Sequence, residues 1–147
     1  MKSIKTNLIN RSLLQLSGKD VQKFLNGICT QSIPKFEDGN KYASFLTPTG
    51  RVLFDSFIYP VKDNDQNLIY YLDVDKRFES SILNLCKKYL LRSKVRIKLL
   101  DQSSYQVWYS NQLPCQSSDV LYQSSDPRLP QLGYRILKHV NDQSDLR

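Results

Sequence analysis

The spacing of apolar residues predicts a sheet protein with two helices. Alternating apolar and polar positions predict strands over residues 8–16, 68–74, 95–100 and 105–109. Apolar residues three and four apart predict helices between Val21 and Ile28 and between Phe78 and Tyr89. Because hairpins join neighbouring strands, the pattern favours an α+β fold in which helices pack on an antiparallel sheet.

Short polar residues mark where the two helices begin. We expect Ser17 to cap the first helix, with Asp20 in the first turn where acidic side chains are favoured. Asp75 is the expected cap of the second helix. Cys86 falls on the apolar stripe of that helix, which predicts an inert core residue.

The segment over residues 42–59 predicts a tight hairpin closed by Pro48-Thr49-Gly50. In its second strand Val52, Phe54, Ser56 and Ile58 share one face, and Leu53, Asp55, Phe57 and Tyr59 share the other. Asp55 thus lies among large apolar neighbours, where an unpaired carboxylate is costly. It needs a partner, a proton, or a cleft that a ligand fills, which makes it the first candidate for function.

The turn leaves the register of this hairpin open. A two-residue loop would place Tyr42 directly opposite Asp55, within reach across the strands. A bulge at Gly50 would shift the pairing by one residue. A purely structural role for Asp55, as acceptor for a nearby backbone N–H, is equally compatible with the sequence.

Composition restricts the class of protein. A chain of 147 residues is one domain or a piece of a larger one, and no apolar run has the length of a membrane span. The three cysteines Cys29, Cys86 and Cys115 have the spacing of neither a disulfide framework nor a metal site. We therefore expect a reducing compartment, no bound metal and no membrane.

The net charge of +7 concentrates in part on one predicted strand. There Lys94, Arg96 and Lys98 alternate with apolar residues and line up on one face, as a basic stripe. Such a stripe suits phosphates, an acidic protein or a ligand with several carboxylates, or is simply a solvated edge. No aromatic-basic motif accompanies it, which argues against nucleic-acid binding.

The composition of the first nineteen residues and of residues 111–147 gives further indications of targeting and of loops. The first nineteen residues are basic and contain no acid, a composition that resembles an organellar targeting segment. Residues 111–125 are rich in Gln and Ser and predict a polar loop. Beyond them, proline and glycine fix the backbone around Arg128 and Arg135, and residues 141–147 form a polar tail.

Several segments, taken in order, resemble a known family. They are Leu8-Ile9-Asn10-Arg11, Leu14-x-Leu16-x-Gly18-x-Asp20, Phe24-Leu25-Asn26-Gly27, the hairpin over 42–55, Lys88-Tyr89-Leu90-Leu91-Arg92, Asp126-Pro127-Arg128 and Leu132-Gly133-Tyr134-Arg135. Together they resemble the folate-fold proteins related to the aminomethyltransferase (T-protein) of the glycine cleavage system. Within these, they are most similar to mitochondrial iron–sulfur cluster assembly factors.

The resemblance implies a fold, a location and a pocket. It implies that residues 1–140 are the N-terminal part of an aminomethyltransferase-like folate-binding domain, because the family's later Lys-Gly-Cys-Tyr-x-Gly-Gln-Glu motif is absent. It places Asp55 where the aminomethyltransferases contact the folate amine, with Tyr42 in the neighbouring pocket, and so implies tetrahydrofolate as a cofactor.

The role implied is that of an accessory factor for [4Fe–4S] protein maturation in the mitochondrial matrix, with cluster assembly proteins as partners. The alternative is a tetrahydrofolate-dependent, aminomethyltransferase-like enzyme in which Asp55 stabilises developing charge.

Overall fold

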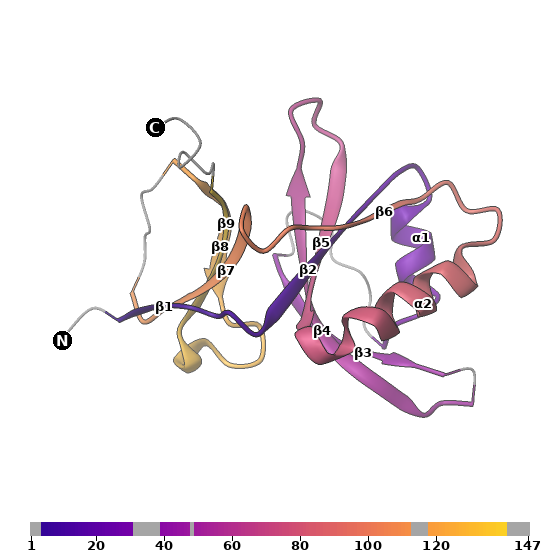
Figure 1. The fold of residues 1–147 in the computed structure, drawn as a ribbon, viewed down its shortest axis with the longest axis horizontal. Coiled ribbons are helices and arrows are strands. Elements are labelled where there is room, and N and C mark those ends of the chain that lie inside the picture. Colours follow the sequence, from indigo (N-terminus) through magenta and orange to yellow (C-terminus); the bar gives the residue numbers. More distant parts are fainter. Residues whose placement is uncertain (1–3, 31–38, 48, 113–117, 141–147) are drawn as a thin grey trace.

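The computed structural model describes residues 4–30, 39–47, 49–112 and 118–140, and these form two antiparallel sheets (Figure 1). The larger sheet has the strand order β3-β4-β5-β2-β6, and the smaller has the order β1-β7-β9-β8. The strands of the larger sheet are β2 (Arg11–Ser17), β3 (Lys41–Leu46), β4 (Val52–Lys62), β5 (Leu68–Asp75) and β6 (Arg96–Leu99). Those of the smaller sheet are β1 (Lys5–Asn7), β7 (Tyr105–Ser110), β8 (Val120–Ser125) and β9 (Tyr134–His139).

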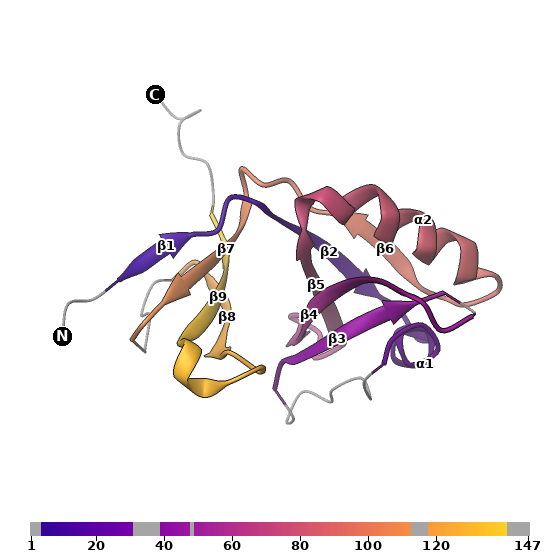
Figure 2. The same ribbon diagram turned by 90° about the horizontal axis from the view of Figure 1, so that it is seen from below.

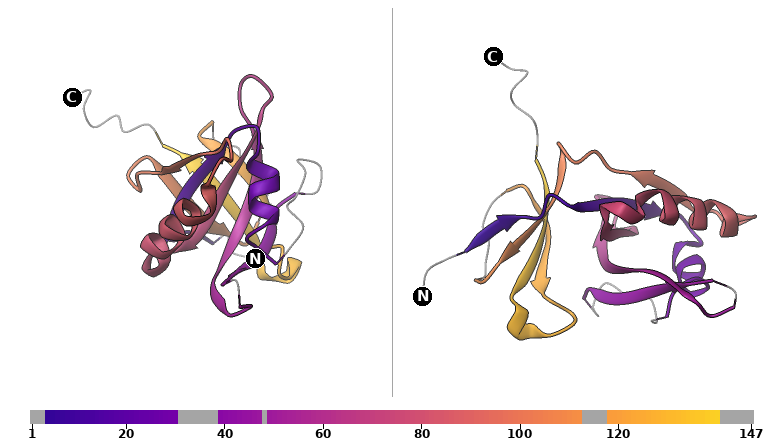
Figure 3. Two further views of the ribbon diagram at one scale, coloured as in Figure 1. Left: turned by 90° about the vertical axis from the view of Figure 1, so that its right-hand side faces the viewer. Right: turned by 60° about the horizontal axis from the view of Figure 1, so that its bottom comes forward.

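The helices and the smaller sheet lie on opposite faces of the larger sheet (Figures 2 and 3). Helices α1 (Val21–Asn26) and α2 (Glu79–Leu90) cover one face and enclose a core that includes Leu14, Phe45 and Ile82. The smaller sheet covers part of the other face, where a second core forms. The expected α+β fold with antiparallel strands and packed helices is confirmed.

The predicted first strand over residues 8–16 begins only at Arg11, where β2 starts, and a separate strand, β1, ends at Asn7. Residues 8–10 form a turn in which Leu8 donates its backbone N–H to Val107 and accepts from the N–H of Arg11. The chain passes here from the smaller sheet to the larger one, so a continuous apolar run spans two cores. The strand over residues 11–16 is confirmed, but its predicted start at Leu8 was wrong, because periodicity within a short run does not reveal where the chain leaves one sheet for the other.

The capping of α1 also differs from the prediction. Ser17 is the last residue of β2, and Asp20 occupies the cap position without a side-chain bond to the helix. Its carboxylate instead accepts from the backbone N–H of Lys94 at 2.9 Å. Gly18, with φ of +122°, packs its Cα directly against the Lys94 carbonyl, where a Cβ would clash. The Gly18-Lys19-Asp20 turn thus fixes the start of the basic strand.

Asp75 is a cap, as the sequence indicates, but a 3-10 turn separates it from the first residue of helix α2. The Asp75 carboxylate accepts from the backbone N–H of Arg77 at 2.9 Å and caps a 3-10 turn, Lys76–Phe78, that leads into the helix. The middle of the predicted apolar stripe, Ile82, Leu85 and Cys86, is buried, and Phe78 and Tyr89 at its ends are half-buried. Burial raises the pKa of Cys86 to about 12, so its thiol stays protonated. Over the ranges that the structure describes, neither helix has the length and apolar character needed to cross a membrane.

The predicted polar loop over residues 111–125 is in part a strand. Residues 113–117 lie outside the described ranges, but β8 pairs with β9 along its length. Tyr122 of β8 packs edge-on against Tyr59, with ring centroids 5.5 Å apart. This aromatic contact and the β9 ladder hold a Ser- and Gln-rich segment in the sheet, which local composition does not reveal.

Candidate functional site

The β3–β4 hairpin has the one-residue slip predicted for a bulge at Gly50, but a second shift changes the register at Asp55 from either predicted alternative. Asp55 lies opposite Ser44, and Tyr42 lies opposite Phe57. The loop closes between Thr47 and Arg51, one residue longer than the two-residue loop, and a bulge at Leu53 adds a second shift. Direct opposition of Tyr42 and Asp55 was therefore wrong. Because the two shifts sum to two residues, both side chains still share one face.

Tyr42 and Asp55 meet diagonally across this hairpin. The Tyr42 hydroxyl donates a hydrogen bond to the Asp55 carboxylate. Burial and the neighbouring Asp55 raise the pKa of Tyr42, so the hydroxyl keeps its proton and remains the donor. Asp55 itself is exposed rather than enclosed by its apolar neighbours. Its carboxylate is thus held by one partner while it stays open to a ligand.

Tyr42 lines a cleft of about 790 Å³ at this end of the molecule. The cleft, hereafter the Tyr42 cleft, lies between the start of β3 and the segment that follows β8. Its lining residues are Gly39, Asn40, Lys41, Tyr42, Ser124, Ser125, Asp126, Pro127, Arg128 and Pro130. Segments more than 80 residues apart in the sequence therefore form its two walls.

The Asp126-Pro127-Arg128 motif folds back on itself to position its arginine. The nearly buried Asp126 carboxylate accepts from the backbone N–H, Nε and Nη2 of Arg128, at 2.9, 3.0 and 2.7 Å. The guanidinium carbon then lies 5.7 Å from the ring centre of Tyr42 and 5.0 Å from that of Phe57. Both distances are within cation–π range.

A buried ionic cluster underlies the cleft and ties the two sheets together. Asp73 of β5 is fully buried, and its carboxylate accepts from Arg11 at 2.6 Å and from Arg135 at 2.6 Å. Tyr59 donates to the same carboxylate at 2.9 Å and accepts from Arg135 Nε at 2.8 Å. Burial and the Asp73 charge raise the pKa of Tyr59, which keeps the proton needed for this bond.

Phe57 is the common neighbour of three arginines. The guanidinium carbons of Arg135, Arg128 and Arg11 lie 3.8, 5.0 and 5.6 Å from the centre of its ring. Sequence reasoning identified neither Phe57 nor Asp73 as a site residue. The available signal was a carboxylate inside the apolar run of β5, an arrangement that requires buried cationic partners.

The basic stripe lies far from the Tyr42 cleft. Lys94, Arg96 and Lys98 are all exposed, as predicted, along β6 and the residues before it. Strand β6 forms one edge of the larger sheet and β3, which carries Tyr42, forms the other. At the usual strand spacing, four intervals separate these edges by about 19 Å. The two sets of predicted site residues are therefore not brought together.

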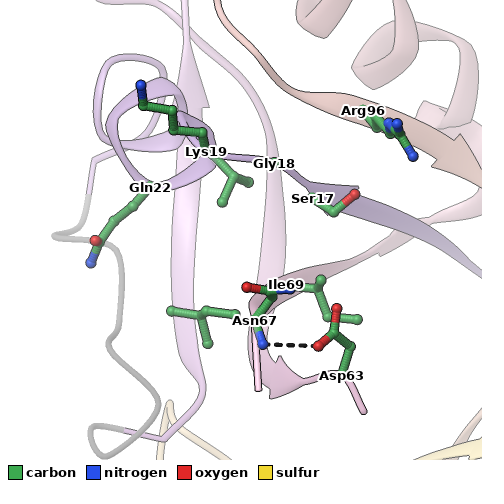
Figure 4. A pocket seen from close by; sticks show the side chains of 10 residues that line it. Ser17, Gly18, Lys19, Gln22, Asp63, Asn67, Ile69 and Arg96 are labelled. Atoms are coloured by element: carbon green, nitrogen blue, oxygen red, sulfur yellow. Dashed lines mark hydrogen bonds between the residues drawn. The ribbon is translucent and has the colours of Figure 1, made fainter. Parts of the chain in front are cut away.

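Arg96 instead lines a second cleft, of about 690 Å³ (Figure 4). This cleft lies between the turn at Ser17–Lys19 and the tip of the β4–β5 hairpin. In that tip Asp63 accepts from the backbone N–H of Asn67 at 2.8 Å. The lining combines two cations, Lys19 and Arg96, and one carboxylate, Asp63, with neutral polar and apolar side chains.

Neither of the two described cysteines belongs to a group of metal ligands. Cys29 is half-buried and Cys86 is buried, whereas Cys115 lies outside the described ranges. Within the described part of the chain, no three His, Cys, Asp or Glu side chains are grouped as metal ligands.

Comparison with known proteins gives a consistent picture. The chain is 35% identical over 149 aligned positions to an iron-sulfur cluster assembly factor IBA57 homolog, mitochondrial, of Coccidioides immitis, which covers 88% of this chain. Proteins of the same name from Pyricularia oryzae and Mycosarcoma maydis are 34% and 36% identical and cover 90% and 86% of the chain. The chain belongs to the family of these IBA57 homologues. No family model matches the sequence.

The match concerns only a part of each family member. The chain spans about a third of the relatives' length, 35%, 35% and 34% in the three cases. The relatives are all named mitochondrial, which confirms the mitochondrial localisation that the resemblance predicts.

A solved structure shows the fold independently. The glycine cleavage system aminomethyltransferase T from Bartonella henselae superposes with a TM-score of 0.67, over 93% of this chain and 42% of that one. Since the two sequences are only 11% identical, the match establishes the shared fold alone.

Proposed function

We propose that the protein is an accessory factor in the maturation of mitochondrial [4Fe–4S] proteins and that Asp55 and Tyr42 belong to a folate-type pocket. The names of the relatives support the first part. The observation that carries the second is the bond between Tyr42 and Asp55 beside the Tyr42 cleft. As part of the same proposal, residues 1–140 correspond to the N-terminal part of the longer family members.

The geometry suits recognition of an amine-bearing ring compound such as tetrahydrofolate. The exposed Asp55 carboxylate can accept a hydrogen bond from a ligand N–H, while the Tyr42 hydroxyl fixes its orientation. The adjoining volume of about 790 Å³ is in the range of small-molecule sites. Asp55 would contact the folate amine, and the cleft would receive the rest of the molecule.

The basic stripe supports an acidic protein partner for this factor. Its distance from the Tyr42 cleft leaves Lys94, Arg96 and Lys98 available to a separate surface. Replacing all three by Gln should weaken association with cluster assembly proteins and reduce its salt dependence. A matched change of Lys87 and Lys88 to Gln, at the end of α2, should leave both unaltered. Equal loss in the two variants would refute the assignment.

Gene deletion in the source organism tests the cellular role. We expect the activity of mitochondrial [4Fe–4S] enzymes to fall while [2Fe–2S] proteins keep theirs, and reintroduction of the gene to restore it. Unchanged [4Fe–4S] activity, or an equal fall in both classes, would exclude a specific role in [4Fe–4S] maturation.

Calorimetric titration of the whole chain with tetrahydrofolate tests the pocket. Asp55→Asn should weaken binding at least tenfold, since it removes the charged acceptor, whereas Asp65→Asn in the exposed β4–β5 turn should not. Equal affinity in the two variants would remove Asp55 from the site. Folate-dependent turnover that is lost in Asp55→Asn would favour the aminomethyltransferase-like enzyme instead.

A further inference from the structure

Asn40 is the most unusual residue of the Tyr42 cleft. It is 93% buried, with 7% of its surface exposed, and its side-chain Nδ2 has no hydrogen-bond partner among the described residues. A buried amide donor without a partner destabilises the fold, because it has lost its hydrogen bonds to water. Its backbone is held in place, because its N–H donates to the Tyr122 hydroxyl of β8. The fold therefore keeps an unsatisfied donor at the wall of a cleft.

Arg128 supplies further unused donors to the same cleft. Two of its five side-chain N–H groups are directed at Asp126, through Nε and Nη2. The Arg128 side chain is 44% exposed, and its Nη1 donates to none of the described residues. Asp126 cannot offer its charge to a ligand, because both of its oxygens already accept from Arg128.

Lys41 adds a second cation to the lining. It is half-buried between Asn40 and Tyr42, and it forms no ion pair with another described residue. The charges that line the cleft thus sum to +1. Arg128 neutralises the negative charge of Asp126, and the positive charge of Lys41 is left over. The hydroxyls of Ser124 and Ser125 lie on the same wall.

From these contacts we propose that the Tyr42 cleft binds a small ligand through a carboxylate, held by Arg128 and by the Asn40 amide. The terminal torsion of Asn is soft, so rotation about it turns Nδ2 toward the cleft and gives the buried donor its missing acceptor. A planar carboxylate matches the fork of a guanidinium, whereas a dianionic phosphate would meet only one unpaired cation here.

This site goes beyond the folate pocket proposed above. Asp55 is not among the residues that line the cleft, and the site does not require the ligand to carry an amine. Asp55→Asn should therefore weaken folate binding at least tenfold but leave carboxylate binding intact, so the two proposals can fail separately.

The test is an NMR titration of the ¹⁵N-labelled full chain with glutarate, glutaramide and inorganic phosphate as probes. Glutarate should give saturable shifts of the Asn40 side-chain amide and the Arg128 Nε–H. The neutral glutaramide should give none, and phosphate should bind at least tenfold more weakly. Shifts of equal size with glutaramide, tighter binding of phosphate, or no saturable shift with glutarate would each overturn the proposal.

Two matched pairs of variants locate the site. Arg128→Gln should weaken glutarate binding at least tenfold, whereas Arg77→Gln should not, although Arg77 makes the same three contacts with Asp75 in an Asp-Lys-Arg segment. Asn40→Leu should likewise weaken binding, whereas Asn64→Leu on the exposed β4–β5 turn should not. The amide spectrum of each variant reports its folding. Equal affinity within either pair would overturn the assignment.

Discussion

At the scale of single residues, Asp55 and Asp126 differ in how far their carboxylates are exposed and in how many hydrogen bonds they accept. Asp55 is exposed and, among the described residues, bonded only to Tyr42, whereas Asp126 is almost fully buried and accepts three hydrogen bonds from Arg128. An exposed carboxylate with one donor contributes little to stability, and a buried one with three contributes much more. Asp55 is thus available for a ligand, and Asp126 is committed to the fold.

We therefore expect Asp55→Ala to leave the protein as stable as the parent, within about 0.5 kcal/mol, because surface changes of this kind remove no buried contact. Urea unfolding measures this change, and the folate titration measures binding on the same sample. A loss of several kcal/mol would show that Asp55 is a structural residue rather than a ligand contact.

Asp126 should make the protein sensitive to acid. Burial opposes ionisation of its carboxyl, but the hydrogen bonds and charge of Arg128 outweigh burial and hold the pKa below its usual value. The stability gained from this shift is present above the unfolded pKa, about 3.9, and is lost as pH falls through the folded value. The difference in Tm between the parent and Arg128→Gln should accordingly shrink below pH 4. A difference that is constant from pH 7 to pH 3 would contradict this.

At the scale of elements, turns and edges carry most of the specific chemistry. The β3–β4 hairpin brings Tyr42 to Asp55, and the Gly18-Lys19-Asp20 turn anchors the start of the basic stripe at Lys94. Periodicity predicted the hairpin, the main helix and most strands. It did not predict the bulge at Leu53 or the strand β8, because both depend on partners elsewhere in the chain.

The anchoring turn gives a prediction with an internal control. Gly18→Ala should destabilise the protein by more than about 2 kcal/mol, because the new Cβ combines a positive φ with a clash against the Lys94 carbonyl. Gly50 also has a positive φ, +87°, but has open space around it, so Gly50→Ala should cost only about 1 kcal/mol. Chemical denaturation compares them, and equal costs would show that the Lys94 contact is not tight.

At the scale of the whole molecule, the buried cluster around Asp73 joins the two sheets. Arg135 comes from the smaller sheet, and Asp73, Tyr59 and Arg11 come from the larger one. The apolar core between the sheets surrounds this cluster, with Leu13, Val107 and Leu137 among its members. The sheets therefore depend on one another for a complete interior.

Asp73→Asn should destabilise the whole protein by about 3–5 kcal/mol, because it leaves the buried Arg135 and the half-buried Arg11 without their common counter-charge. Thermal unfolding monitored by Trp108 fluorescence and by far-UV circular dichroism should show one shifted transition. Asp75→Asn, at an exposed pair two residues away, is the control and should cause a much smaller shift. A similar effect of both changes would mean that the cluster does not couple the sheets.

The sequence by itself determined the fold class, the main elements and the residues on each face of the hairpin. These follow from the periodicity of side chains along one segment, which local physics fixes. The tertiary structure decided the rest: the register at Asp55, the burial of Asp73 between Arg11 and Arg135, and the unpaired Asn40 amide beside Arg128. Each of these depends on segments that are distant in sequence and meet only when the two sheets pack, so no local pattern encodes it.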